Sequence, residues 1–153
     1  MPPIVYVAGR YRAATREMVA ANIEAAGRVG AMTCRIGWFP IIPHMNTAHL
    51  DEYDPGLGDE FWLTGTMALM ERCDALVLVP GWQESAGTLA ELTRARQLGM
   101  PIYMSTDVLP NAETFLKGNT LQLSARRLIE SSIDARRAAD DVHAQKMRTS
   151  PTQ

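Results

Sequence analysis

The sequence predicts a single-domain α/β fold: a Rossmann-like, flavodoxin-like parallel sheet with flanking helices, followed by a helical tail. Short apolar runs typical of buried strands alternate along the chain with segments of helical period. The order β-α-β-α-β-α-β favours right-handed crossovers and a parallel sheet. Ligands of such sheets bind outside the carboxyl ends of the strands, so we expect a site at the first and third strand-to-helix turns.

The first half of the chain supplies two strands and a helix. A β-branched and aromatic run between a proline and a glycine predicts the first strand at residues 4–8. Apolar residues near the helical period predict a helix over residues 15–30, and residues 39–42 form the second strand. Polar residues, prolines and glycines mark 43–58 as a long loop that serves as a lid or pocket wall.

The second half continues the alternation. Helical spacing resumes over residues 59–72, and the most apolar run of the chain, residues 75–79, predicts a central strand. A further helix is expected over residues 88–98, where a glycine follows, and residues 101–104 supply another strand. We therefore assign residues 1–117 to one α/β domain.

Residues 118–153 differ in character from the domain. Their mixed charges predict a solvated helical extension that becomes disordered over residues 149–153. The apolar residues of this tail make a partial stripe, enough to dock on the domain or a second subunit but too short for a coiled coil. These residues are Leu121, Leu128, Ile129 and Ile133.

Composition narrows the classes of partner. The formal charge of −2 gives no electrostatic reason to expect a nucleic acid polymer or an anionic membrane as partner. No apolar run is long enough to cross a bilayer, and the N-terminus lacks a basic leader. Cys34 and Cys73 lack metal or disulfide spacing and read as buried thiols, and Met18, Met67 and Met70 read as core. We expect a cytoplasmic protein without metal or cofactor.

The turn after the third strand is a natural anion site. Gly87 lets the backbone approach a ligand, Ser85 and Thr88 offer hydroxyls, and the first helical N–H groups carry partial positive charge. The structural alternative is a capping box, in which Glu91 only reaches back to the backbone N–H of Thr88. From spacing alone, the capping box is the stronger reading.

The turn after the first strand adds basic groups beside the same edge of the sheet. Gly9 is followed by Arg10 and Arg12, whose guanidinium groups suit phosphate oxygens. The alternative is that both arginines are ordinary solvated residues. Tyr6 lies on the buried strand, where packing explains its ring but its hydroxyl still needs a partner.

Aromatic and histidine residues near these turns allow several interpretations. Trp62, on an apolar helix face, reads as core, whereas Trp82 lies in the loop and is the expected ligand contact. His44 and His49 with Asp51 suggest a metal site, but on a loop their spacing fixes no geometry. We therefore expect no metal.

Four segments together resemble the nucleoside 2-deoxyribosyltransferase superfamily. They are residues 5–9, 73–80, 85–88 with Glu91, and 99–102. The chain is most similar to the DUF4406 branch, whose Pro-Gly-Trp-(Glu/Gln)-x-Ser-x-Gly signature stands at residues 80–87. The resemblance covers about residues 4–104 and implies that residues 1–117 form a nucleoside deoxyribosyltransferase-like domain.

The resemblance implies roles for individual residues. The residue matching Glu91 is the nucleophile that attacks C1′ of the sugar, and the one matching Tyr6 lies in the pocket beside it. In the nucleotide-hydrolysing branch, the residues matching Ser85 and Arg12 bind the 5′-phosphate. Transferases carry an aspartate at the Ser85 position, so the serine favours a nucleoside 5′-monophosphate.

One position departs from the family pattern. Active members keep an aspartate eight residues before Asp74, where this chain has Thr66. Either another carboxylate protonates the leaving base, with Asp51, Asp54 and Asp59 as candidates, or the chain binds its ligand without turnover. A second, fainter similarity, to cytokinin-activating phosphoribohydrolases, points to the same N-glycosidic bond.

The sequence thus predicts a nucleotide N-glycosidase that cleaves the base–sugar bond of a (deoxy)nucleoside 5′-monophosphate, or performs the related deoxyribosyl transfer. Glu91 is the expected nucleophile with Tyr6 beside it. The expected substrate contacts are Gly9, Arg10, Arg12, Trp82, Ser85, Gly87 and Thr88. The resemblance implies a homo-oligomer, a dimer or tetramer, with sites completed across the interface. The rival interpretations are a non-catalytic nucleotide sensor or adaptor and a purely structural domain.

Overall fold

The computed structural model describes residues 1–53 and 56–149. The chain divides into two compact units, residues 1–113 and residues 114–153. The boundary falls at Glu113, close to the end expected at residue 117. The first unit holds all the strands of the sheet and every predicted site residue.

The sheet has four parallel strands in the order β2-β1-β3-β4. This arrangement confirms the predicted fold class and the central place of the third strand. The strands are β1 (Ile4–Ala8), β2 (Phe39–Ile41), β3 (Ala75–Leu78) and β4 (Ile102–Tyr103). Because β1 and β3 are neighbours, the turns that follow them meet at one edge of the sheet.

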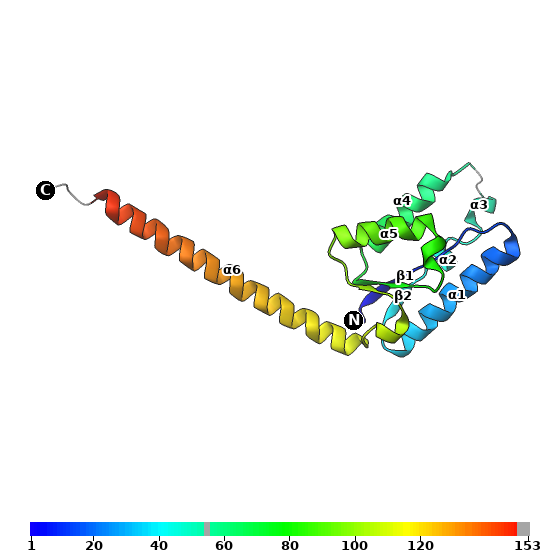
Figure 1. The fold of residues 1–153 in the computed structure, drawn as a ribbon, viewed down its shortest axis with the longest axis horizontal. Coiled ribbons are helices and arrows are strands. Elements are labelled where there is room, and N and C mark those ends of the chain that lie inside the picture. The colour runs from blue at the N-terminus through cyan, green and yellow to red at the C-terminus, as the bar shows by residue number, and fades with distance from the viewer. Residues whose placement is uncertain (54–55, 150–153) are drawn as a thin grey trace. The chain divides into compact units, whose positions relative to one another are not determined.

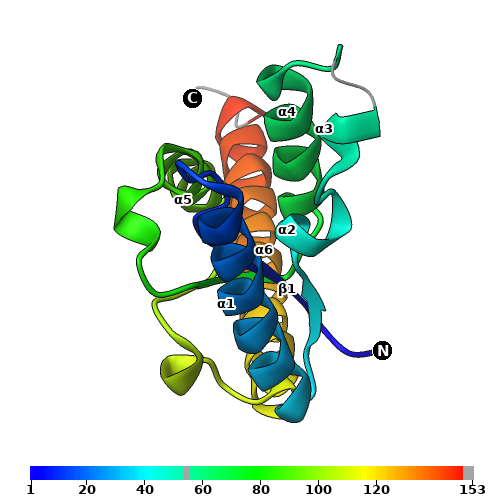
Figure 2. The ribbon, with the colours of Figure 1, turned by 90° about the vertical axis from the view of Figure 1, so that its right-hand side faces the viewer.

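Helices cover both faces of the sheet (Figure 1). On one face, Tyr6 and Leu76 form a core cluster with residues of α4 (Asp59–Met70) and α5 (Ala86–Gln97). On the other face, α1 (Arg16–Arg35) contacts β1 and β2 and returns antiparallel to β1 (Figure 2). Side chains alternate along each strand, so both faces of β1 and β3 are buried.

Helix α1 begins at the predicted place and ends later than predicted. The Thr15 hydroxyl accepts a hydrogen bond from the Met18 N–H at 3.3 Å and caps the helix. Gly30 was expected to end the helix, but it lies within it, where a Cβ would stand 2.4 Å from Ile42 Cδ1. This glycine serves close packing, and the helix ends only at Arg35, shortly before Gly37 with its φ of +88°.

The described part of the region between β2 and α4 contains two short helices where a loop was expected. They are α2 (Pro43–Asn46) and α3 (Leu50–Tyr53). Pro43 occupies the first position of α2, where its fixed φ favours helix and its missing N–H costs nothing. Two short helical turns, η1 (Trp82–Glu84) and η2 (Thr106–Val108), complete the first unit.

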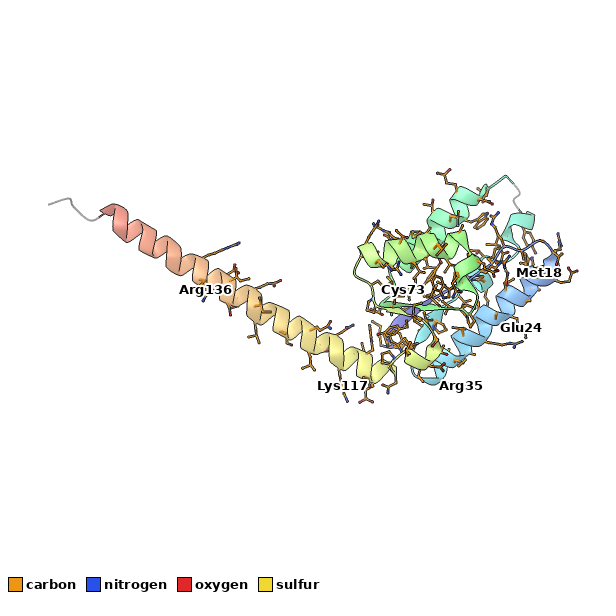
Figure 3. The ribbon with its side chains drawn as sticks, in the orientation of Figure 1. Met18, Glu24, Arg35, Cys73, Lys117 and Arg136 are labelled. Carbon is orange, nitrogen blue, oxygen red and sulfur yellow. The ribbon has the colours of Figure 1, made fainter. Side chains whose placement is uncertain are left out.

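Part of the predicted core is wrong. Met70 is fully buried and Met67 packs against the core cluster, but Met18 is 46% exposed on α1, where Figure 3 labels it with Glu24 and Arg35. Cys34 is exposed and Cys73 is only partly buried. Helical period identifies residues that share a face, but it does not say how far that face extends over the sheet.

The second unit belongs to α6 (Ala112–Thr149), one continuous helix of 38 residues on which Figure 3 labels Lys117 and Arg136. The stripe residues Leu121, Leu128 and Ile129 are exposed. Residues 150–153, where disorder was expected, lie outside the described residues. Within the described part of the chain, no helix is long and apolar enough to span a membrane.

Candidate active site

A cavity of about 480 Å³ opens at the carboxyl ends of β1 and β3. Its walls come from the turn after β1, from α2 and α4, and from the turn that leads from β3 into α5. The predicted site residues that line it are Gly9, Arg10, Arg12, Ser85, Gly87, Thr88 and Glu91. A cavity of this size suits a small organic ligand.

Glu91 lies on α5 and lines this cavity, and its carboxyl group is hydrogen-bonded to Tyr6. The Tyr6 hydroxyl donates a hydrogen bond to Glu91 Oε1 at 2.5 Å. Tyr6 is fully buried and does not line the cavity, whereas the resemblance implied a residue within the pocket. In the described residues, this hydroxyl is the only hydrogen-bond partner of the Glu91 carboxyl group.

The surroundings of the pair change both acidities. Burial raises the pKa of Glu91 to about 7, and the hydrogen bond from Tyr6 opposes this rise. Burial, followed by the nearby charge of Glu91, raises the pKa of Tyr6 far above its usual value. Tyr6 therefore keeps its proton and remains a donor, while Glu91 exchanges its proton near neutral pH.

The capping-box interpretation of Glu91 is wrong. Helix α5 begins at Ala86, and its cap is Ser85, whose hydroxyl oxygen accepts a hydrogen bond from the Thr88 N–H at 3.2 Å. Thr88 therefore lies inside the first turn, and Glu91 bonds to Tyr6 instead of the helix start. Thr88 also resembles a helix cap, which is why spacing alone placed the start two residues too late.

Unpaired polar atoms collect at the cavity. Three buried side-chain atoms of the described chain lack a hydrogen-bond partner: His44 Nδ1, Trp62 Nε1 and Thr88 Oγ1. All three belong to residues that line the cavity. A buried polar group without a partner costs roughly 1–3 kcal/mol, so a ligand that pairs with these atoms would bind favourably. We name His44, Trp62, Thr88 and Glu91 the cavity floor.

His44 contributes an acceptor to the cavity floor. Its Nε2 lies 2.8 Å from the carbonyl oxygen of Gly9, and because a carbonyl only accepts, this nitrogen carries the hydrogen. Burial lowers the pKa of His44, so the ring is neutral and Nδ1 is a free acceptor. The position of His44 just after the strand beside β1 is the signal that could have identified it.

The structure does not support the metal site considered for His44, His49 and Asp51. Among the described residues, no group of three histidine, cysteine or acidic side chains is arranged to hold a metal ion. The side chain of Asp51 lies outside the described part. His44 instead bonds to the backbone and packs edge-on against Tyr11, with ring centroids 5.6 Å apart.

The two tryptophans have exchanged their expected places. Trp62, which was assigned to the core, lines the cavity, and its ring contacts Phe61 edge-on. Trp82, the expected ligand contact, does not line the cavity and packs against the core cluster. Part of the apolar face of α4 lines the cavity, whereas the Trp82 ring of η1 packs against the protein core.

The arginines of the first turn are neither free nor simply solvated. Arg10 forms a 2.7 Å ion pair with Glu84, and Arg12 forms an ion pair with Asp59. These four residues line the cavity and their side chains are 36–73% exposed. We name them the cavity rim.

Backbone packing fixes the first turn beside the cavity. A Cβ on Gly9 would lie 2.7 Å from Cβ of Val79, so only glycine fits there without displacement. Gly87 also lines the cavity, but a Cβ there would meet no atom closer than 3.8 Å. Gly9 is thus required by close packing, whereas Gly87 leaves room for a ligand.

Thr66, the residue noted above as a departure from the pattern that the sequence resembles, lines the cavity and donates a hydrogen bond to the Leu63 carbonyl oxygen at 3.1 Å. Of the carboxylates considered as replacements, Asp59 is engaged by Arg12. Asp54 lies outside the described residues, and so does the side chain of Asp51. Asp59 is thus the only one of these three carboxylates whose side chain is described, and its partner is Arg12.

Comparison with models of known protein families assigns the α/β domain to one family. A family model described as "Domain of unknown function (DUF7768)" matches residues 3–105. The match covers most of the chain, so the protein belongs to this family, and it includes every residue that lines the cavity. A search of curated proteins found no match.

Proposed function

We propose that this protein is an N-glycosidase that cleaves the base–sugar bond of a nucleoside-type ligand, a (deoxy)nucleoside 5′-monophosphate, with deoxyribosyl transfer as the close variant. The observation that carries the proposal is the placement of Glu91. Its carboxyl group faces the cavity and is held by one hydrogen bond from a tyrosine that keeps its proton. An oriented, ligand-facing carboxylate suits nucleophilic attack at an anomeric carbon.

In the proposed reaction, the ionised Glu91 carboxylate attacks C1′ of the sugar as the bond from C1′ to the base nitrogen breaks. The base leaves with the bonding electron pair and takes up a proton. Water then attacks C1′, the bond from C1′ to the carboxylate oxygen breaks, and the water gives up a proton to the solvent, so that the sugar and the free carboxylate are restored. In the transfer variant a nitrogen of a second base replaces this water and loses its proton in the same way. The proposal assigns Tyr6 a positioning role, because its hydrogen bond fixes the carboxyl group.

Among the described residues, the proposed site has no obvious side chain to protonate the departing base. Thr66 has no acidic proton, and Asp59 is already paired with Arg12. We infer that water supplies the proton, which favours bases that leave readily. In this account His44 Nδ1 accepts a hydrogen bond from the ligand and orients it.

The raised pKa of Glu91 predicts the pH dependence of turnover. Because the nucleophile must be ionised, base release should rise as the pH increases through about 7. The profile is measured from about pH 5 to about pH 9. A rate that falls over this range would mean that Glu91 acts as an acid.

The proposal is tested by incubating the protein with ribo- and deoxyribonucleoside 5′-monophosphates, with and without a second base as acceptor, and separating the products by chromatography. Glu91→Gln should reduce base release by about 1000-fold or more, as expected for loss of a nucleophile. Glu71→Gln is the matched control, because Glu71 pairs with Arg94 outside the cavity lining. Release that persists in Glu91→Gln would exclude this residue as the nucleophile.

Thr66 favours a second candidate function, a nucleotide sensor that binds without turnover. In that case the wild type and Glu91→Gln would both bind nucleotides, which a thermal shift detects, and neither would release base. A purely structural domain would show no shift with any nucleotide. Assembly into a dimer or tetramer and a cytoplasmic location stay predictions.

A further inference from the structure

In the cavity rim, each of the two guanidinium groups that line the cavity is paired with a carboxylate. We propose that Glu84 and Asp59 set the selectivity of the site for charge at the sugar end of its ligand. They do so by occupying the guanidinium groups that a phosphate would bind. The inference rests on the proposed function, which places a nucleoside-type ligand in this cavity.

The two carboxylates reach the arginines from different elements. Arg10 and Arg12 belong to the turn after β1, whereas Glu84 ends η1 and Asp59 begins α4. Glu84 immediately precedes Ser85, the cap of α5. It therefore lies beside the helix N-terminus, where backbone N–H groups favour an anion.

The arginines are held in place by more than the carboxylates. Arg10 Nε donates a hydrogen bond to the backbone carbonyl oxygen of Arg12 at 3.2 Å, while its Nη1 contacts Glu84 at 2.7 Å. The guanidinium of Arg10 thus has a second anchor within its own turn. Removing the Glu84 charge leaves that anchor intact and frees one edge of the group for phosphate oxygens.

Exposure determines how easily the exchange occurs. The Glu84 and Asp59 side chains are 73% and 64% exposed, so both carboxylates have water as an alternative partner. A phosphate carries more charge and more acceptor oxygens than either carboxylate, and it can displace them. The displacement weakens phosphate binding, whereas a ligand with a 5′-hydroxyl leaves the ion pairs untouched. The carboxylates therefore reduce the difference in affinity between phosphorylated and unphosphorylated ligands, but the phosphorylated ligand still binds more tightly.

A positioning role for the carboxylates predicts the opposite result. If Glu84 and Asp59 mainly orient the guanidinium groups, their removal loosens the arginines and weakens phosphate binding. The sign of the change therefore distinguishes competition from positioning.

The test measures binding of 2-deoxyribose 5-phosphate and of 2-deoxyribose by calorimetry. The proteins are the wild type, Glu84→Gln, Asp59→Asn and the double variant, and Glu71→Gln is the control with the same change in net charge as each single variant. We expect the sugar phosphate to bind about threefold more tightly to each single variant and about tenfold more tightly to the double variant. The control and the binding of 2-deoxyribose should not change, and added salt should reduce the gain.

Unchanged or weaker binding of the sugar phosphate in the double variant, with thermal unfolding like that of wild type, would overturn the inference. Lack of binding to every protein would overturn it as well. Base release from nucleotides by the wild type is scored separately and tests the proposed function. Turnover with no gain in the variants refutes only the inference, and a gain without turnover refutes only the glycosidase.

Discussion

The cavity floor and the cavity rim differ in how their polar groups are paired. On the floor, His44, Trp62 and Thr88 each bury a polar atom that no other group of the described protein satisfies. On the rim, Arg12 is exposed and Arg10 is half-buried, and each is already paired with a carboxylate. The floor therefore gains from a ligand that brings hydrogen-bonding atoms, whereas the rim exchanges one partner for another.

The difference implies separate tasks for the two regions. Low exposure strengthens every interaction on the floor, so we assign orientation and chemistry to it. High exposure weakens the interactions of the rim, so we assign selectivity to it.

The first prediction concerns the effect of the Glu91 carboxyl group on the free energy of unfolding of the protein. Burial raises its pKa from 4.5 to about 7, so between these pH values the folded protein retains a proton that the unfolded chain has released. The free energy of unfolding should therefore fall as the pH rises through this window. Between about pH 5 and about pH 8, Glu91→Gln should gain on the order of 2 kcal/mol relative to wild type.

Urea unfolding at the two pH values measures this gain. Glu71→Gln should show no comparable pH-dependent change relative to wild type. A constant difference between Glu91→Gln and wild type would mean that the carboxyl group is not desolvated.

The second prediction removes the support of Glu91. Tyr6→Phe deletes the 2.5 Å hydrogen bond and should lower base release at neutral pH by about 10- to 100-fold. Because this bond lowers the pKa of Glu91, its loss should also move the rising limb of the pH–rate profile to higher pH. A merely structural role would reduce the rate without moving the profile.

The third prediction tests whether the unpaired atoms of the floor await a ligand. Thr88→Val deletes an unsatisfied hydroxyl, so the protein should be unchanged or about 1 kcal/mol more stable, while nucleotide affinity falls. Thr33 is the matched control, since it is equally buried but its hydroxyl donates to the Gly30 carbonyl oxygen at 2.8 Å. Thr33→Val should cost about 1 kcal/mol. Equal losses of stability in both variants would contradict the account.

The fourth and smallest effect is expected at the rim. Arg10→Ala breaks an exposed ion pair and should change the free energy of unfolding by less than about 1 kcal/mol. Chemical denaturation checks this value. A larger loss would show that the rim supports the fold and would remove the distinction between the two regions.

The sequence predicted that the turns after β1 and β3 lie at one edge of the sheet, but it did not predict the side-chain contacts between them. Alternation of strands and helices put the turns after β1 and β3 at one edge, and the structure has Gly9 and Glu91 in the same cavity. Helical period placed Trp62 on an apolar face, yet it could not tell a face that meets the sheet from one that meets a cavity.

The Arg10–Glu84 contact, which was not predicted, joins residues far apart in the chain, because β1 and β3 are adjacent. Tyr6 was expected beside Glu91 from the family resemblance alone, and the same adjacency explains their hydrogen bond. Spacing within one segment carries no information about such pairs, so the local capping box was preferred for Glu91. Their physical origin is the packing of the sheet, which local pattern does not encode.

The central claim, that Glu91 attacks the sugar, is tested most directly by trapping the intermediate. The protein is mixed with a nucleotide that it turns over, quenched with acid and analysed by mass spectrometry of the intact chain and of its peptides. We expect a glycosyl adduct on the peptide that contains Glu91, with no adduct on Glu91→Gln. Base release by the wild type without an adduct, or an adduct on another residue, would contradict the account.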